Sequence, residues 1–90
     1  MRVGQARRRD ATEKAICDAL EAFGAEVMKI SGAGLPDLFV CYRGHWTPLE
    51  VKSAAGGLTP LQRERATSGR PLIPVARTVE QALAVIGVGR

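Results

Sequence analysis

The sequence has little of what several common kinds of protein require. It contains two cysteines and one histidine in 90 residues. Cys17 and Cys41 lack the paired spacing of a zinc site or a disulfide framework, and His45 has no second histidine with which to share a metal ion. We therefore expect both cysteines to be reduced and structural, and His45 to be a loop residue.

Long hydrophobic runs are also missing. No apolar stretch approaches the roughly 20 residues that span a membrane. The first ten residues, MRVGQARRRD, lack the apolar core of a signal peptide. We expect an intracellular protein that is neither secreted nor membrane-bound. The sequence shows no low-complexity tract and no internal repeat.

What the chain does contain fits one small folded domain. Hydrophobic residues make up 46% of the sequence, and a chain this short buries only about two-thirds of its unfolded surface, which is too little for two cores. Residues 1–9 are basic and aperiodic. We predict a flexible arm there, followed by a single domain over residues 10–90.

The formal net charge of +4 and the pI near 9.7 suit a polyanionic partner. Arginine is well matched to phosphate because its planar guanidinium group presents several N–H donors. Charge alone does not establish nucleic-acid binding, since many small basic proteins bind none. The candidates for phosphate contact are Arg7, Arg8, Arg9, Arg63 and Arg65.

Local patterns predict an α/β domain with a mixed sheet. Residues 10–24 form the first helix, with Asp10 as its N-cap and Gly24 at its end. Thr59 and Thr78 are the expected N-caps of two later helices. The full predicted order is a helix at 10–24, strands at 25–31, 37–43 and 46–52, a helix at 58–69, a strand at 71–77 and a helix at 78–87.

The second and third predicted strands form a hairpin, with Gly44 and His45 in its turn. Pro48 cannot donate a backbone hydrogen bond, so the third strand is expected to begin near Leu49 or to bulge there.

The hairpin brings charged residues together. Side chains alternate along a strand, so Glu50 and Lys52 share a face, and Asp37 on the neighbouring strand can converge on them if the register permits. Two carboxylates suit Mg²⁺, which prefers oxygen ligands and leaves other positions to water and phosphate. A lysine beside the ion could orient water and offset developing charge.

Each of these residues also has a simple structural interpretation. Glu50 and Lys52 alone fit a solvated strand face, with an ion pair worth no more than about 1 kcal/mol. Asp37 follows Pro36, and Pro-Asp is common in turns. The three residues together indicate a metal site more strongly than any one of them does alone.

Three segments together resemble a known family: GLPDLFV (34–40), LEVK (49–52) and GGLTPLQ (56–62), behind a helix that carries Glu13. They are similar to the virus-type replication-repair nuclease (VRR-NUC) domain of the PD-(D/E)xK nuclease superfamily. The resemblance covers nearly the whole chain after the basic arm, and it implies a restriction-endonuclease-like core with helices flanking the sheet.

The resemblance implies a role for each matching residue. Asp37 and Glu50 would be metal ligands, with the Val51 carbonyl as a third protein oxygen. Lys52 would position or activate water. Gln62 would help hold the lysine, the water or the scissile phosphate. A further residue, Glu13, would bind metal directly or through water.

Two of these residues have a competing explanation. Glu13 and Gln62 both occupy predicted capping-box positions and could merely satisfy free backbone N–H groups. Glu13 precedes Ile16 and Leu20 by three and seven residues, so it faces inward, where a carboxylate needs a partner.

The expected function is therefore a Mg²⁺-dependent, structure-selective DNA endonuclease, with Mn²⁺ able to substitute and no small-molecule cofactor. No sequence-reading module is visible, so arginines would grip phosphates and recognise DNA shape. Stand-alone members of the family resemble Holliday-junction-resolving nucleases of viral or phage type, which implies a homodimer acting on branched DNA, encoded by a phage in a bacterial host.

Two alternatives remain open. A non-catalytic nucleic-acid-binding or assembly module would keep the basic surface and the fold, although it has no need of two carboxylates that repel phosphate. A site-specific restriction-type enzyme would share the chemistry. It would also need base-reading loops, for which 90 residues leave little space.

Overall fold

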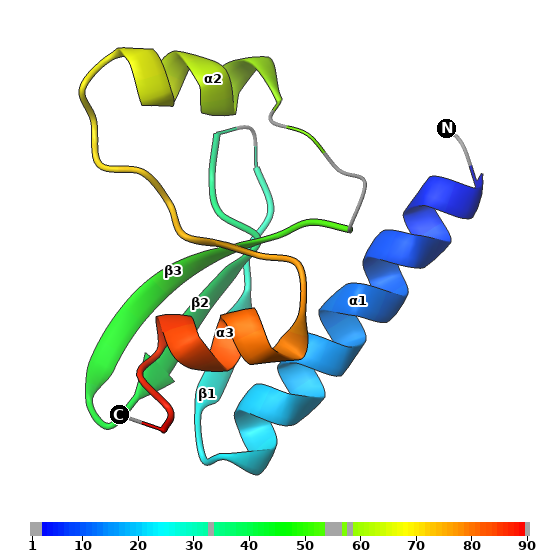
Figure 1. The fold of residues 1–90 in the computed structure, drawn as a ribbon, viewed down its shortest axis with the longest axis vertical. Helices are drawn as coiled ribbons and strands as arrows, with labels where there is room; N and C mark the ends of the chain where they lie inside the picture. Colours follow the sequence, from blue (N-terminus) through cyan, green and yellow to red (C-terminus); the bar gives the residue numbers. More distant parts are fainter. Residues whose placement is uncertain (1–2, 33, 54–56, 58, 90) are drawn as a thin grey trace.

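The computed structural model describes residues 3–32, 34–53, 57 and 59–89, with side chains from residue 11 onward. The predicted order α-β-β-β-α-β-α is confirmed (Figure 1). The elements are α1 (Val3–Ala22), β1 (Glu26–Lys29), β2 (Leu38–Tyr42), β3 (His45–Val51), α2 (Pro60–Thr67), β4 (Val75–Ala76) and α3 (Val79–Val85).

The four strands form one mixed sheet in the order β1-β2-β3-β4. The β1–β2 and β2–β3 pairs are antiparallel, and β4 pairs in parallel with β3. The parallel pairing needs a long crossover connection, which α2 and its flanking segments supply. The predicted α/β class with a mixed sheet is confirmed.

The turn between β2 and β3 lies one residue earlier than predicted. Arg43 and Gly44 have φ angles of 52° and 81°, and His45 is already paired with Tyr42 as the first residue of β3. Positive φ at both central residues matches the right-handed twist of the strands, and glycine accepts this conformation readily. His45 is therefore a strand residue, and its assignment to the turn was wrong.

The first helix begins at Val3 and not at Asp10. Residues 3–9 continue it because arginine, glutamine and alanine all favour the helix, whatever the hydrophobic pattern. Asp10 lies within α1 and is not its N-cap. Glu13 consequently lies well past the first turn, so the capping explanation for Glu13 no longer applies.

Pro48 lies inside β3, opposite Phe39, and neither begins the strand nor makes it bulge. The N–H of Glu50 points away from β2, since it donates to the Pro74 carbonyl. By alternation the Pro48 nitrogen faces the same side, where β4 pairs only with Glu50 and Val51. The missing N–H therefore costs the sheet no ladder hydrogen bond.

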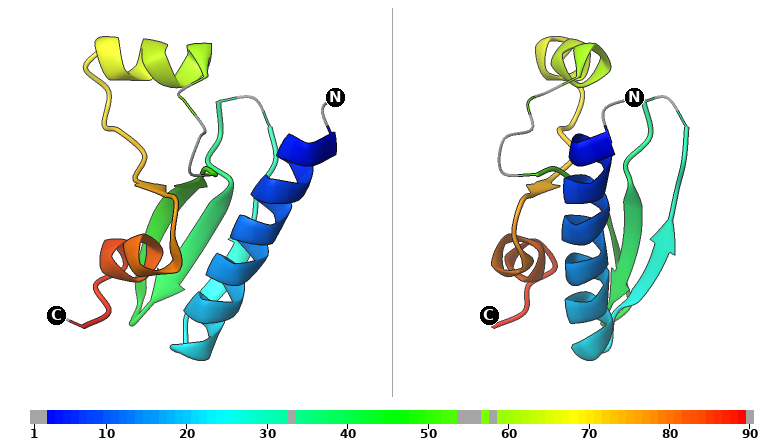
Figure 2. Two further views of the ribbon diagram at one scale, coloured as in Figure 1. Left: turned by 45° about the vertical axis from the view of Figure 1, so that its right-hand side comes forward. Right: turned by 90° about the vertical axis from the view of Figure 1, so that its right-hand side faces the viewer.

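The core lies between one face of the sheet and the helices α1 and α3. Leu38 and Leu49 pair directly and are fully buried, together with Ile16 and Leu20 of α1. In the right-hand view of Figure 2, α1 and α3 lie on the same side of β1, β2 and β3. Ala82 of α3 completes this core.

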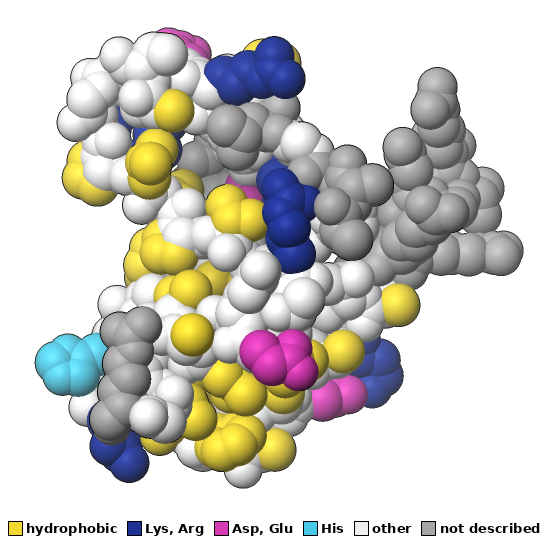
Figure 3. Space-filling view, in the orientation of Figure 1, with side chains coloured by type: hydrophobic (Ala, Val, Ile, Leu, Met, Phe, Trp, Pro, Cys, Tyr) yellow, Lys and Arg dark blue, Asp and Glu magenta, His cyan; other side chains and the backbone are white. Residues whose placement is uncertain are grey.

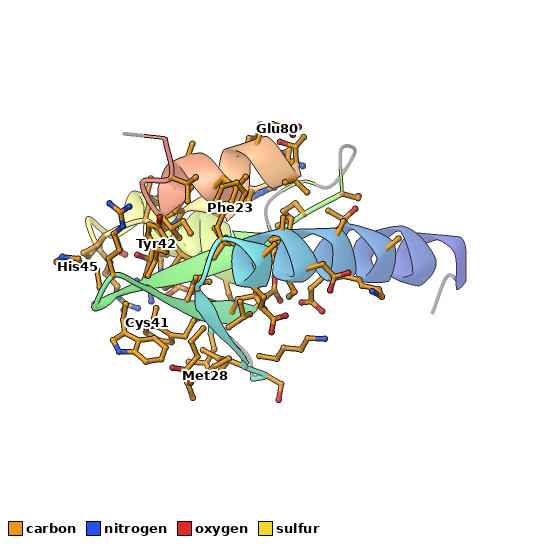
Figure 4. The ribbon with its side chains drawn as sticks, turned by 90° about the horizontal axis from the view of Figure 1, so that it is seen from below. Phe23, Met28, Cys41, Tyr42, His45 and Glu80 are labelled. Carbon is orange, nitrogen blue, oxygen red and sulfur yellow. The ribbon has the colours of Figure 1, made fainter. Side chains whose placement is uncertain are left out.

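The opposite face of the antiparallel strands has no helix packed over most of its length. Met28 and Trp46 are 51% and 48% exposed there, and the Phe39 and Trp46 rings meet edge to face at 6.1 Å. Figure 4 shows Met28 and Cys41 on this side and Tyr42 on the α3 side. Away from α2, this face is open and carries the partly exposed Met28, Phe39 and Trp46.

The helix α2 lies over one end of the sheet, away from α3 (Figures 1 and 2), and it has no buried residue. Thr59 caps it as predicted, with Pro60 at its first position, and Thr78 caps α3. Among the described helices, none has the length and hydrophobicity that a bilayer crossing requires.

Leu20→Ala tests the assignment of the core. Leu20 is fully buried, so removing its side chain leaves a cavity, and we expect the free energy of unfolding to fall by about 2–5 kcal/mol in urea denaturation. Leu72→Ala is the matched control, because Leu72 is 68% exposed, and its expected effect is within about 0.5 kcal/mol. Equal losses for the two variants would contradict this core.

Candidate metal centre

The register of the hairpin places Asp37 across from Glu50. Leu38 pairs with Leu49, and Asp37 and Glu50 are the next residues along each strand. Opposite residues of an antiparallel pair share a face, with Cβ atoms about 4.5–5.5 Å apart. Because the Glu50 N–H bonds to Pro74 at 2.8 Å, this is the non-hydrogen-bonded kind of pair, in which side chains approach most closely.

Asp37 also closes the end of the hairpin. Its Oδ2 accepts a 2.8 Å hydrogen bond from the Val51 N–H. The register places Pro36 opposite Val51, where the two backbones would otherwise exchange hydrogen bonds. The Asp37 carbonyl accepts from the Ile30 N–H at 2.9 Å, which ties the same residue to the chain just after β1. The Asp37 carboxylate thus replaces the backbone carbonyl that would otherwise accept a hydrogen bond from the Val51 N–H.

The Val51 carbonyl points to the same side as the Val51 N–H, toward the end of β2, as both groups of one strand residue do. Pro36 lies across from it and has no N–H to donate. A backbone oxygen therefore faces the place where β2 ends, on the same side of β3 as the Asp37 carboxylate.

Glu50 is a buried carboxylate held by α2. It is 7% exposed, and it accepts a hydrogen bond from Gln62 Nε2. The Gln62 Oε1 accepts from the Thr59 N–H at 2.9 Å, and the Gln62 N–H donates to Thr59 Oγ1 at 3.2 Å. The capping box therefore fixes the carboxamide with its NH₂ group toward Glu50. Gln62 is both a capping residue and a partner of Glu50.

Lys52 follows directly after β3 and is half-buried. Its N–H donates to the Ala76 carbonyl at 3.1 Å, so its backbone continues the pairing with β4. By alternation its side chain leaves β3 on the same face as Glu50. The predicted grouping of Asp37, Glu50 and Lys52 thus agrees with the register.

Glu13 lies beside Lys29 of β1. Its carboxylate and the Lys29 ammonium are 4.0 Å apart, and 20% of the Glu13 side chain is exposed. Burial, and after it the charge of Glu13, raises the pKa of the Cys17 thiol. Within the described residues, no group of three or more His, Cys, Asp or Glu side chains could hold a metal ion. Glu13 is therefore not gathered with Asp37 and Glu50.

The predicted phosphate-contacting arginines lie on two helices, α2 and the beginning of α1. Arg63 is exposed on α2, and Arg65 donates from Nη1 to the Pro71 carbonyl at 3.1 Å, so it also braces the end of that helix. Figure 3 shows basic side chains over α2 and directly below it. The side chains of Arg7, Arg8 and Arg9 fall outside the described part of the structure.

The sequence offered Arg77 only as one of several guanidinium groups suited to phosphate and did not place it beside the site. Its Nη1 donates to the Ser53 carbonyl at 2.6 Å, across 24 residues of sequence. The order of the predicted elements could have indicated this contact, because a strand that follows a helix crossover runs parallel to the strand before the helix. The end of the strand at 71–77 could then have been placed beside Lys52.

The donor set is made of oxygen. Asp37 and Glu50 would supply carboxylates, and Val51 would supply a backbone carbonyl. Oxygen ligands select hard cations such as Mg²⁺ and Mn²⁺, whereas softer sulfur and imidazole groups favour zinc or copper. These residues fit a hard divalent cation.

Comparison with known proteins agrees with this fold. No family model matches the sequence, and no curated protein matches it. A solved structure described as a VRR_NUC domain superposes with a TM-score of 0.64 and 27% sequence identity, over 92% of this chain and 98% of that chain. This chain is therefore similar to a VRR-NUC domain over nearly its whole length. The predicted resemblance to that family and the restriction-endonuclease-like fold are thereby confirmed.

Two substitutions at Asp37 separate its hydrogen bond from its charge. In Asp37→Ala the buried Val51 N–H loses its acceptor, and we expect the free energy of unfolding to fall by about 1–3 kcal/mol. In Asp37→Asn the carboxamide oxygen can still accept that hydrogen bond, so the loss is smaller. Urea denaturation measures the free energy of unfolding of both variants, and equal losses would contradict the role of the Asp37 carboxylate as acceptor of the Val51 N–H.

Gln62→Glu tests the contact with Glu50. Glutamate completes a capping box as glutamine does, but it places a second carboxylate against Glu50 and raises the pKa of the pair above the unfolded value of about 4.3. The variant should therefore lose stability as the pH rises above that value, reaching at least about 1 kcal/mol at pH 7.

Gln81→Glu is the matched control, because Gln81 occupies the same position of α3 behind the Thr78 cap. Its side-chain oxygen accepts from the Arg77 N–H, and glutamate keeps that bond. The control should lose little stability as the pH rises. If both variants show the same pH dependence of stability, the Gln62–Glu50 contact is wrong.

Proposed function

We propose that this chain works as the VRR-NUC domain that it resembles, as a divalent-metal-dependent DNA endonuclease that hydrolyses phosphodiester bonds. The observation that carries the proposal is the position of Asp37 opposite Glu50, with the Val51 carbonyl directed to the same end of the hairpin. Asp37, Glu50 and this carbonyl would hold Mg²⁺, and Mn²⁺ would substitute. A bound divalent cation lowers the pKa of water and stabilises negative charge on phosphate.

The protein's own groups have separate tasks. Asp37 and Glu50 are held by Val51 and Gln62, so neither carboxylate has to be ordered when substrate arrives. Lys52, on the same face as Glu50, would orient the attacking water and offset the charge that develops on the phosphate. A contribution from Glu13 is proposed only through water, since Glu13 pairs with Lys29.

DNA is the proposed substrate. Arg63 on α2 is exposed and next to Gln62, so it can contact a phosphate near the scissile bond. Arg65 and the N-terminal Arg7, Arg8 and Arg9 would extend this grip. Phosphate contacts position a protein on DNA without reading its sequence, which favours recognition of DNA shape. We therefore propose a branched substrate such as a Holliday junction, as expected for a nuclease of phage type.

A homodimer would match the two-fold symmetry of a four-way junction. The apolar stretch 82–87 is a candidate for the dimer surface, but Ala82 is buried and Leu83, Val85 and Ile86 pack against the core, which leaves less of it to offer to a partner. The exposed Met28 and Trp46 on the helix-free face are better candidates, since soluble monomers rarely leave large apolar patches open.

Cleavage assays test the catalytic proposal. With Mg²⁺, the protein should cut four-way junctions or flaps in preference to duplex DNA, and a chelator should stop cleavage. We expect Lys52→Ala to slow cleavage by about 10²- to 10³-fold, and Asp37→Asn to abolish metal-dependent cutting. DNA binding should persist in both variants.

Two results would count against this function. If the unmodified protein binds DNA but never cuts it with metal present, the non-catalytic binding module is the better description. If cutting survives both substitutions, Asp37 and Lys52 are not the active-site residues.

Sedimentation of the protein with and without junction DNA tests the dimer. We expect a dimer at micromolar concentration, and Trp46→Arg should shift the equilibrium toward monomer because it places a charge in the apolar interface. Leu72→Arg, at an exposed leucine outside this face, is the control. Monomer alone under all conditions would rule out the dimeric resolving nuclease.

A further inference from the structure

We propose that Arg77 is a positioning residue for Lys52 and for the Val51 carbonyl. This inference rests on the proposed nuclease function. It assigns a task to a residue that lies outside the matching motifs and 25 positions after Lys52 in the sequence.

The site residues lie where β3 loses its regular pairing. Regular strand structure ends at Val51. Beyond it, the backbone is held from the β4 side by two successive hydrogen bonds: Lys52 N–H to the Ala76 carbonyl at 3.1 Å, and Arg77 Nη1 to the Ser53 carbonyl at 2.6 Å. The second bond involves a charged donor, which makes it stronger than a neutral one.

Arg77 is itself fixed in place. It is half-buried, and its N–H donates to Gln81 Oε1 at 2.7 Å. The Gln81 N–H in turn donates to the N-cap Thr78 Oγ1 at 3.1 Å. The first turn of α3 therefore holds the Arg77 backbone, while the Arg77 guanidinium holds the Ser53 carbonyl. The end of β3 is tied through Arg77 to a helix that packs in the core.

The hydrogen bond from Arg77 to Ser53 affects the position of Lys52, because a lysine side chain has four flexible carbons and no rigid geometry of its own. Where its ammonium can lie depends on where its backbone is anchored. The same anchor fixes the peptide group between Val51 and Lys52, which contains the Val51 carbonyl. A displacement of about 1 Å at a reacting group can slow an enzyme by 10²-fold.

The contact also distinguishes Arg77 from Arg63, which is proposed to contact DNA. Arg63 is exposed on α2, whereas Arg77 is half-buried and directed at backbone. Loss of Arg77 should therefore slow the chemical step and leave the affinity for DNA unchanged. Loss of Arg63 should weaken the affinity for DNA.

The experiment compares Arg77→Met, Arg77→Lys and the control Arg63→Met in single-turnover cleavage at saturating junction DNA, with DNA binding measured in the presence of a chelator. We expect Arg77→Met to lower the cleavage rate by about 10- to 100-fold with unchanged DNA affinity. Arg77→Lys should recover part of that rate, because its ammonium can still donate to Ser53. Circular dichroism confirms that each variant is folded.

Hydrogen exchange, followed by mass spectrometry without DNA or metal, provides a readout independent of activity. Arg77→Met should accelerate exchange in the peptide that contains Lys52 and Ser53, and Arg63→Met should not. An unchanged cleavage rate, or a weaker DNA affinity with an unchanged rate, overturns the inference. Unchanged exchange at Lys52 and Ser53 overturns it as well. If the unmodified protein cuts no DNA while exchange responds as expected, the proposed function fails and the anchoring contact stands.

Discussion

The arrangement of the site depends on one hydrogen bond, from the Val51 N–H to the Asp37 carboxylate. Pro36 cannot continue the β2–β3 ladder, and the carboxylate next to it supplies the acceptor instead. This closes the hairpin in a register that puts Asp37 across from Glu50. A slip of one residue would turn every side chain of a strand to the other face, so the pair exists only in this register.

The same site also holds α2 in place. That helix has no buried residue, so it gains little from apolar packing. Gln62 ties its first turn to Glu50, and Arg65 ties its last turn to the Pro71 carbonyl. The dependence is mutual, because the buried carboxylate of Glu50 needs a hydrogen-bond donor in its low-dielectric surroundings. A basic helix proposed to contact DNA is therefore linked directly to a proposed metal ligand.

Features set by local chemistry could be predicted from the sequence, and features set by packing could not. The caps Thr59 and Thr78 follow from short-range rules and were placed correctly. The start of α1 was missed because residues 3–9 favour the helix through propensity and carry no apolar pattern. The partners of Glu13 and Arg77 depend on how the helix α1 and the strand β4 pack, which no local pattern encodes. The functional roles came from the family resemblance and not from composition.

The proposed function requires that Asp37 and Glu50 share one cation. A crystal grown with Mn²⁺, measured at a wavelength where manganese scatters anomalously, tests it directly. We expect an anomalous peak between the two carboxylates, within bonding distance of the Val51 carbonyl oxygen, and its loss in Glu50→Gln. A peak bound by other residues, or no peak with Mn²⁺ present at millimolar concentration, would show that Asp37 and Glu50 do not share a cation.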